Sequence, residues 1–90
     1  MANGFREDTF TYEIVKPLGV ISTRTDGYGN EWSREVNLVA WNHKRPKIDI
    51  REWNSDHSKM SKGITMTDDE AEQLGMVLHN YITERSNDDR

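Results

Sequence analysis

The sequence contains no cysteine and only two prolines among its 90 residues. Without cysteine the chain can form no disulfide, no thiolate metal site and no cysteine nucleophile. Its apolar stretches are only a few residues long, and residues 1–4 form neither a cationic leader nor a hydrophobic run. We therefore expect no signal peptide, no membrane span and no membrane partner, and a cytoplasmic location.

Motifs for catalysis and metal binding are also missing. The sequence has no paired nucleophile and base, no phosphate-binding loop and no ligand cluster. Asp56 and His57 are adjacent but lack a third ligand, so we interpret them as part of a hydrogen-bonded turn. His43 and His79 are isolated. We expect no enzyme activity, no cofactor, no metal site and no small-molecule substrate.

The length of the chain predicts a single small domain. A chain of this size buries a limited fraction of its surface, which favours assembly into an oligomer. We expect polar residues 1–8 to be a flexible N-terminus, residues 9–84 to form the folded domain and residues 85–90 to be a disordered tail.

The charge is unevenly distributed along the chain. The net charge is −4, yet residues 42–62 hold six Lys or Arg against three Asp or Glu, a net of +3. Residues 68–90 hold seven acids and two cations, a net of −5. A polyanion would be attracted to the first segment and repelled by the second.

Alternating apolar residues predict four strands, over about residues 9–24, 31–41, 47–53 and 62–66. Pro17 and Gly19 interrupt the first segment, which indicates one long curved strand, or two short strands, at a sheet edge. Turn-forming residues separate the segments.

One amphipathic helix follows the strands. Thr67 and Glu70 form a capping box at its start, and an apolar stripe continues to about residue 83 or 84. The predicted fold is α+β, with a four-stranded antiparallel sheet followed by one C-terminal helix. Because one helix covers one face of such a sheet, we expect it to pack on the residues of strands three and four that share one face. These are Ile48, Ile50, Ile64 and Met66.

The other face of the sheet carries aromatic and charged side chains. In the third strand, alternation places Lys47, Asp49, Arg51 and Trp53 opposite Ile48. In the second strand, it places Glu35, Asn37, Val39 and Trp41 on the outer face, opposite Val36, Leu38 and Ala40. An aromatic side chain among exposed cations suits a planar, anionic ligand. Asp49 is interpreted as an ion-pair partner that orients Arg51 or a lysine.

These segments resemble the single-stranded-DNA-binding family of the transcriptional coactivator positive cofactor four, in its C-terminal domain. Ile48–Glu52, Lys62–Met66 and the capped helix carry the resemblance. Further pieces resemble the bacterial YdbC-like branch: Trp32–Asn37, Trp41-Asn42, Pro46-Lys47, Trp53, Asp56-His57 and Lys59-Met60. The eukaryotic pattern has two aromatics after Arg-Glu, whereas here Asn54 follows Trp53.

The resemblance implies a curved antiparallel sheet in a homodimer that binds single-stranded DNA with little sequence preference. It places aromatic positions on Trp41 and Trp53 and basic contacts on Lys44, Arg51 and Lys62. The expected process is transcription, or replication, repair or recombination of DNA.

The residues themselves support a mechanism of stacking and phosphate contact. We expect Trp41 and Trp53 to stack on bases, and Arg51 to contact phosphate or a base. Lysines would follow the backbone, asparagines would reach base edges, and Trp32 is either a DNA contact or a core or dimer residue. The full set is Trp32, Asn37, Trp41, Asn42, Lys44, Lys47, Arg51, Trp53, Lys59 and Lys62.

Two alternatives use the same surface. Single-stranded RNA could replace DNA, because nothing in the sequence reads the 2′-hydroxyl. A protein-interaction adaptor could present the same sheet face to an acidic, aromatic partner.

Overall fold

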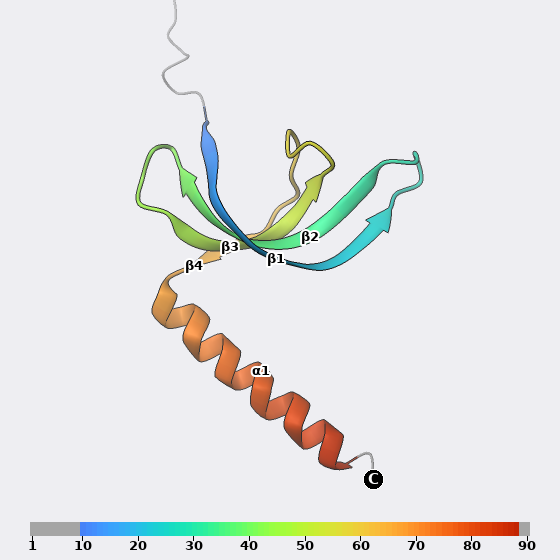
Figure 1. The fold of residues 1–90 in the computed structure, drawn as a ribbon, viewed down its shortest axis with the longest axis vertical. Helices are drawn as coiled ribbons and strands as arrows, with labels where there is room; N and C mark the ends of the chain where they lie inside the picture. Colours follow the sequence, from blue (N-terminus) through green and yellow to red (C-terminus); the bar gives the residue numbers. More distant parts are fainter. Residues whose placement is uncertain (1–9, 89–90) are drawn as a thin grey trace, which may run out of the picture.

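The computed structural model describes residues 10–88, which form four strands and one helix (Figure 1). Neighbouring strands pair antiparallel in the order β1-β2-β3-β4, which confirms the predicted fold. The flexible N-terminus predicted for residues 1–8 lies outside the described residues. The elements are β1 (Tyr12–Thr25), β2 (Glu31–Trp41), β3 (Lys47–Asn54), β4 (Ile64–Met66) and α1 (Asp68–Asp88).

β1 is a single long edge strand that bends the sheet. Its register with β2 shifts at three places, between Ile14 and Lys16, between Pro17 and Gly19, and between Val20 and Ser22. Such irregularities increase the local bend and twist of a strand. The sheet therefore curves into a trough with a concave and a convex face, and the segment between β3 and β4 rises on the concave side (Figure 1).

Within one chain, the concave face is the better buried of the two. The register pairs Asn37 with Asp49 and Val39 with Lys47, so these side chains share this face as alternation predicted. Val39, Asp49 and Trp53 are 0% exposed, whereas Ile48 on the convex face is only half-buried. The apolar convex face thus lacks a cover within the described residues.

The helix begins as predicted but does not pack on the sheet. Thr67 Oγ1 accepts a hydrogen bond from the Glu70 amide at 3.1 Å, and Glu70 Oε1 accepts one from the Thr67 amide at 2.8 Å, which confirms the capping box. Among the described elements α1 contacts only β3 and β4, and it extends away from the sheet (Figure 1). The expectation that α1 covers the convex face was wrong, because a cap fixes where a helix starts and not what its apolar side meets.

The apolar stripe of α1 is consequently exposed. The radius of gyration is 16.9 Å, against about 12 Å for a compact chain of this length. α1 also continues to Asp88, beyond the predicted end of the domain, with Arg85 in the last turn where a cation interacts favourably with the helix dipole. No helix among residues 10–88 combines the length and the apolar character needed to cross a membrane.

The turn between β1 and β2 is organised by Asp26. Asp26 Oδ1 accepts hydrogen bonds from the amides of Tyr28 and Asn30, both at 2.9 Å, and Oδ2 accepts one from Trp32 Nε1 at 2.9 Å. The bond from Trp32, followed by that from the Asn30 amide, lowers the pKa of Asp26 to about 2. The ionised carboxylate therefore stabilises the folded hairpin.

Replacing Asp26 with Asn should destabilise the protein at pH 7, because an amide cannot accept all three hydrogen bonds. The contribution of Asp26 is fully present well above pH 4 and decreases as the pH falls toward 2, because the folded-state pKa is the lower one. Urea unfolding at pH 7 and pH 3 should show a smaller difference between the two proteins at pH 3. Glu31→Gln in the same hairpin is the control, and an undiminished difference at pH 3 would contradict this role.

Candidate nucleic-acid interface

Aromatic rings form a row along the concave face. The rings of Phe10 and Trp41 stack with centroids 5.4 Å apart and planes at 29°. Tyr12 lies 6.0 Å from Trp41 and 5.3 Å from Trp53, and Trp53 lies 5.5 Å from His57. Phe10, at one end of the row, is 55% exposed, so the row offers an accessible aromatic surface there.

Arg51 joins this row to the charged part of the face. Its Nε and Nη2 donate to Oδ1 and Oδ2 of Asp49, both at 2.7 Å, in a bidentate pair. The guanidinium carbon lies 4.5 Å from the Trp41 ring centroid, at cation–π distance. Asp49 orients Arg51, as interpreted from the sequence, and Arg51 in turn supports Trp41.

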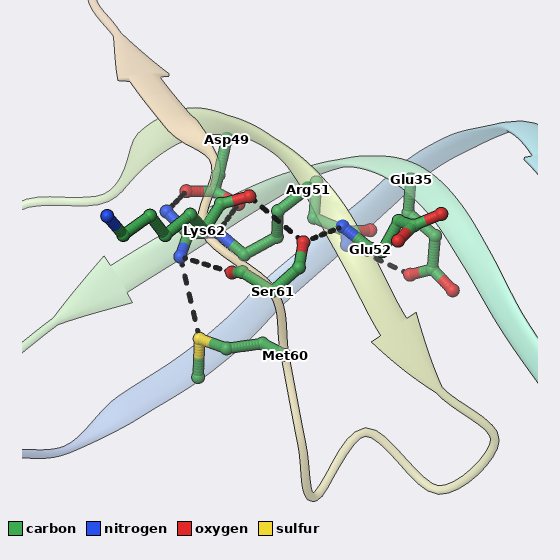
Figure 2. Close-up of polar contacts among 8 residues, drawn as sticks. Glu35, Asp49, Arg51, Glu52, Met60, Ser61 and Lys62 are labelled. Carbon is green, nitrogen blue, oxygen red and sulfur yellow. Dashed lines mark hydrogen bonds and ion pairs between the residues drawn. The ribbon is translucent and has the colours of Figure 1, made fainter. Parts of the chain in front are cut away.

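The segment before β4 closes the other side of Arg51 (Figure 2). Arg51 Nη1 donates to the Ser61 carbonyl at 3.3 Å and approaches Met60 Sδ at 3.6 Å. A Cβ on Gly63 would lie 2.3 Å from the Arg51 Cβ, so only glycine allows this close approach. With its donors occupied and its side chain 13% exposed, Arg51 serves as a support more than as a free phosphate contact.

A cleft of about 350 Å³ opens beside this cluster. Phe10 and Trp41 provide its aromatic surface, and none of the residues 10–88 that line it is a carboxylate. Cations from β3 and from the turn that follows β2 surround the rings, so the cleft combines stacking surface with positive charge. Its lining residues are Phe10, Trp41, Lys44, Arg45, Lys47, Arg51 and Thr65.

The turn that carries two of these cations has an uncommon backbone. Asn42 and His43 have φ values of 51° and 64°, and the Lys44 amide donates to the Trp41 carbonyl at 2.9 Å. Two consecutive residues with positive φ are typical of a tight turn that matches strand twist. The turn brings the backbone of Lys44 back to Trp41, and both residues line the cleft.

Acidic residues limit the cleft on one side. Arg45 and Lys47 also line a hollow with Asp68 and Asp69 at the start of α1. These carboxylates would repel a polyanion. The basic and acidic segments, which are separate in the sequence, therefore meet at this hollow, and the carboxylates limit the basic surface on that side.

Four of the predicted site residues meet at the cleft: Trp41, Lys44, Lys47 and Arg51. Lys62 is exposed and follows Ser61, the residue whose carbonyl holds Arg51. It lies before β4, which starts only at Ile64, so strand alternation does not determine where its side chain points.

Two predicted contacts are buried. Trp53 is 0% exposed and packs against Tyr12 and His57, so the expectation of an exposed stacking platform was wrong. Asn37 is 1% exposed, and its Nδ2 donates to Glu35 Oε1 at 3.1 Å, so it reaches no base edge in this conformation. The alternation placed both residues on the correct face but did not reveal what covers them.

The remaining candidates lie elsewhere or are partly occupied. Trp32 belongs to the opposite face, where Arg24 lies 5.7 Å from its ring. Lys59 lines a separate hollow that includes Trp32. Asn42 follows Trp41 in the chain, and its Oδ1 accepts a hydrogen bond from the Thr11 amide at 2.9 Å.

Sequence reasoning missed Phe10, Arg45 and Thr65. Phe10 falls within the first predicted strand, residues 9–24, and Arg45 falls within the basic segment, residues 42–62, but neither was predicted to belong to the site. The register of Tyr12 with Trp41, once known, brings Phe10 to Trp41.

Comparison with known proteins agrees with this geometry. The family model described as Transcriptional Coactivator p15 (PC4) matches residues 29–76, which is more than half of the chain. An uncharacterized protein of Treponema pallidum (strain Nichols) is 41% identical over 76 residues, covering 84% of this chain and 85% of that protein. The chain belongs to the Transcriptional Coactivator p15 (PC4) family.

The match to the PC4 family confirms the resemblance at the level of the family. It spans β2, β3, β4 and the first part of α1. Trp41, the basic turn, Arg51 and the segment that holds Arg51 therefore all lie within the matched region, whereas Phe10 lies outside it.

In this PC4-family chain, Arg51→Ala should lower the free energy of unfolding by about 3 kcal/mol, because it leaves the buried Asp49 carboxylate without its partner. Replacing both residues, as Asp49→Asn with Arg51→Met, should cost less, since no buried charge remains unpaired. Urea denaturation measures both effects. Arg45→Ala, an exposed arginine at the same cleft, should change stability by less than about 0.5 kcal/mol. An equal loss in the single and double variants would contradict the assignment.

Proposed function

We propose that this protein binds single-stranded DNA with little sequence preference at the cleft on the concave face. The observation that carries the proposal is that the stacked rings of Phe10 and Trp41 line one cleft together with cations from β3 and from the turn after β2. Membership of the PC4 family supports a single-stranded nucleic acid as the ligand and a binding domain without catalysis.

Stacking supplies the part of the affinity that is independent of sequence. Every base has a flat face, and stacking on an aromatic side chain is worth about 1–3 kcal/mol per base. Phe10 is the more exposed ring, and Trp41 is supported by Arg51. Bases in a duplex are already stacked, so unpaired strands should bind more tightly.

Phosphate contacts supply the electrostatic part. Lys44, Arg45 and Lys47 surround the rings, and Lys62 extends the basic surface. Three neutralised phosphates would give a slope of log affinity against log salt of roughly −2, at about −0.7 per contact for a single strand.

Within the family, we assign the chain to the YdbC-like branch on the motifs around Trp32–Asn37 and Trp41-Asn42. The process it serves is transcription, as the family description suggests, or DNA replication, repair or recombination.

Trp41→Ala should weaken binding to oligo-dT by more than 1 kcal/mol, because it removes a stacking surface. Fluorescence anisotropy at two salt concentrations measures the affinity and its salt slope. Trp32→Ala, on the convex face, should leave the affinity unchanged. Failure of the wild type to bind at low salt would refute the proposal and favour the adaptor alternative.

Duplex DNA and a matched RNA are the two further ligands in this assay. Weaker binding of the duplex is expected. RNA binding more tightly than DNA would assign the site to single-stranded RNA instead.

The protein is also proposed to act as a homodimer. Two apolar surfaces lack a cover within residues 10–88: the convex face of the sheet and the stripe on α1. A second copy offers the same two surfaces, so pairing could bury both at once. The exposed apolar residues of α1 are Met76, Val77, Leu78, Tyr81 and Ile82.

Leu78→Asp should convert the dimer to a monomer, because a carboxylate in the centre of the stripe cannot be buried without a large cost. Sedimentation equilibrium measures the mass. His79→Asp adds the same charge beside the stripe and should leave the dimer intact. A wild-type protein that sediments as a monomer would refute the dimer, and oligo-dT binding by that monomer would show that the cleft works alone.

A further inference from the structure

The segment between β3 and β4 is fastened to the sheet at His57. His57 Nε2 lies 2.9 and 3.1 Å from the two carboxylate oxygens of Glu35 on β2. The His57 carbonyl accepts a hydrogen bond from Tyr12 Oη at 2.6 Å. The imidazole ring of His57 packs on the ring of Trp53. One residue thus contacts β1, β2 and β3.

The backbone of His57 shows that these contacts fix its conformation. Its φ is 61°, in the left-handed region that a residue other than glycine seldom adopts. Such a conformation is unfavourable in itself and persists only where the surroundings hold it. Here the conformation is stabilised by the contacts of His57 with Glu35, Tyr12 and Trp53.

The Glu35 carboxylate is a buried, ionised hydrogen-bond acceptor. It is 8% exposed, and its carboxylate also accepts hydrogen bonds from Ser33 and Asn37. Burial raises the pKa of Glu35, but the hydrogen bonds from Ser33, Asn37 and His57 outweigh it and leave the pKa below its ordinary value. An ionised carboxylate only accepts, so His57 Nε2 carries the proton in this contact.

The same segment reaches the proposed binding site a few residues later. Met60 pairs with Trp53 on β3, and the amide of Glu52 donates to Ser61 Oγ at 3.1 Å. Ser61 and Met60 then contact Nη1 of Arg51, the residue that lies over Trp41 (Figure 2). His57 itself does not line the Phe10–Trp41 cleft, so any effect it has on that cleft passes through this segment.

We propose that His57 is a positioning residue: through its contacts with Glu35 and Tyr12 it holds Met60 and Ser61 against Arg51, and so fixes Arg51 over the Trp41 ring. This inference rests on the proposed nucleic-acid function of the cleft. It assigns a role to a histidine that is not among the predicted nucleic-acid contacts.

The test compares His57→Ala and His57→Gln with wild-type full-length protein. His57→Ala should weaken oligo-dT binding about fivefold and speed the exchange of the Arg51 Nε–H proton with water, measured by NMR. His57→Gln should keep most of the oligo-dT affinity and most of the protection of the Arg51 proton, because the glutamine side-chain N–H can donate to Glu35. His79→Ala, a histidine on α1, is the matched control. Tyr12→Phe removes only the hydrogen bond to the His57 carbonyl and should shift both readouts in the same direction by a smaller amount.

Several results would overturn the proposal. The first is a folded His57→Ala protein with unchanged affinity and unchanged Arg51 exchange. The second is weaker binding with unchanged exchange, which would mean that His57 touches the nucleic acid directly. The third is a His57→Gln protein as impaired as the alanine variant.

If His57→Ala does not fold, the His57→Gln and Tyr12→Phe variants test the proposal through the same two measurements, oligo-dT affinity and the exchange rate of the Arg51 Nε–H proton. If the wild type binds no oligonucleotide, the proposed function fails. The exchange rate of the Arg51 Nε–H proton in the His57 variants then still tests whether His57 positions Arg51.

Discussion

The ion pair between Asp49 and Arg51 is the interaction on which the concave face depends. Asp49 is fully buried, and a buried carboxylate is tolerated only when it is paired and hydrogen-bonded. The bidentate geometry satisfies both oxygens and directs the guanidinium over Trp41. The pair therefore connects the core of the sheet to its aromatic surface. Because most donors of Arg51 are occupied, the positive charge offered to a ligand comes from the lysines and from Arg45.

The two faces of the sheet have different roles. The concave face buries polar and aromatic groups, including the Asp49–Arg51 pair, and it ends in an accessible ring pair with cations beside it. The convex face is apolar and half-buried around Ile48, with ion pairs of Glu52 to Arg24 and Arg34 elsewhere on it, and α1 leaves its own apolar stripe exposed. The first pattern suits a flat, anionic ligand and the second suits a copy of the same chain.

The sequence predicted those features that depend on local pattern. The alternation in β2 and β3 identified which residues share a face, and Thr67 with Glu70 identified the start of α1. The site residues Trp41, Lys44, Lys47 and Arg51 followed from the same alternation and from the charge of this segment.

Features that depend on distant contacts could not be predicted in this way. Alternation does not show what covers a face, so Trp53 was expected to be exposed, whereas Tyr12 and His57 cover it. The positive φ of His57 has no local signal of the kind that glycine provides. The direction of α1 depends on surfaces that its own periodicity does not specify. The position of Phe10 beside Trp41 depends on the register of β1 with β2, which the sequence pattern does not specify.

The three tryptophans provide the most direct test of the central claim, because they occupy three environments. Trp41 lies at the cleft, Trp53 is buried within the aromatic row and Trp32 lies on the opposite face. The indole N–H signals can be followed by NMR during a titration with oligo-dT. The signal of Trp41 should shift most and that of Trp32 should remain in place. A shift confined to Trp32, with Trp41 unchanged, would contradict the assignment of the concave cleft as the binding site.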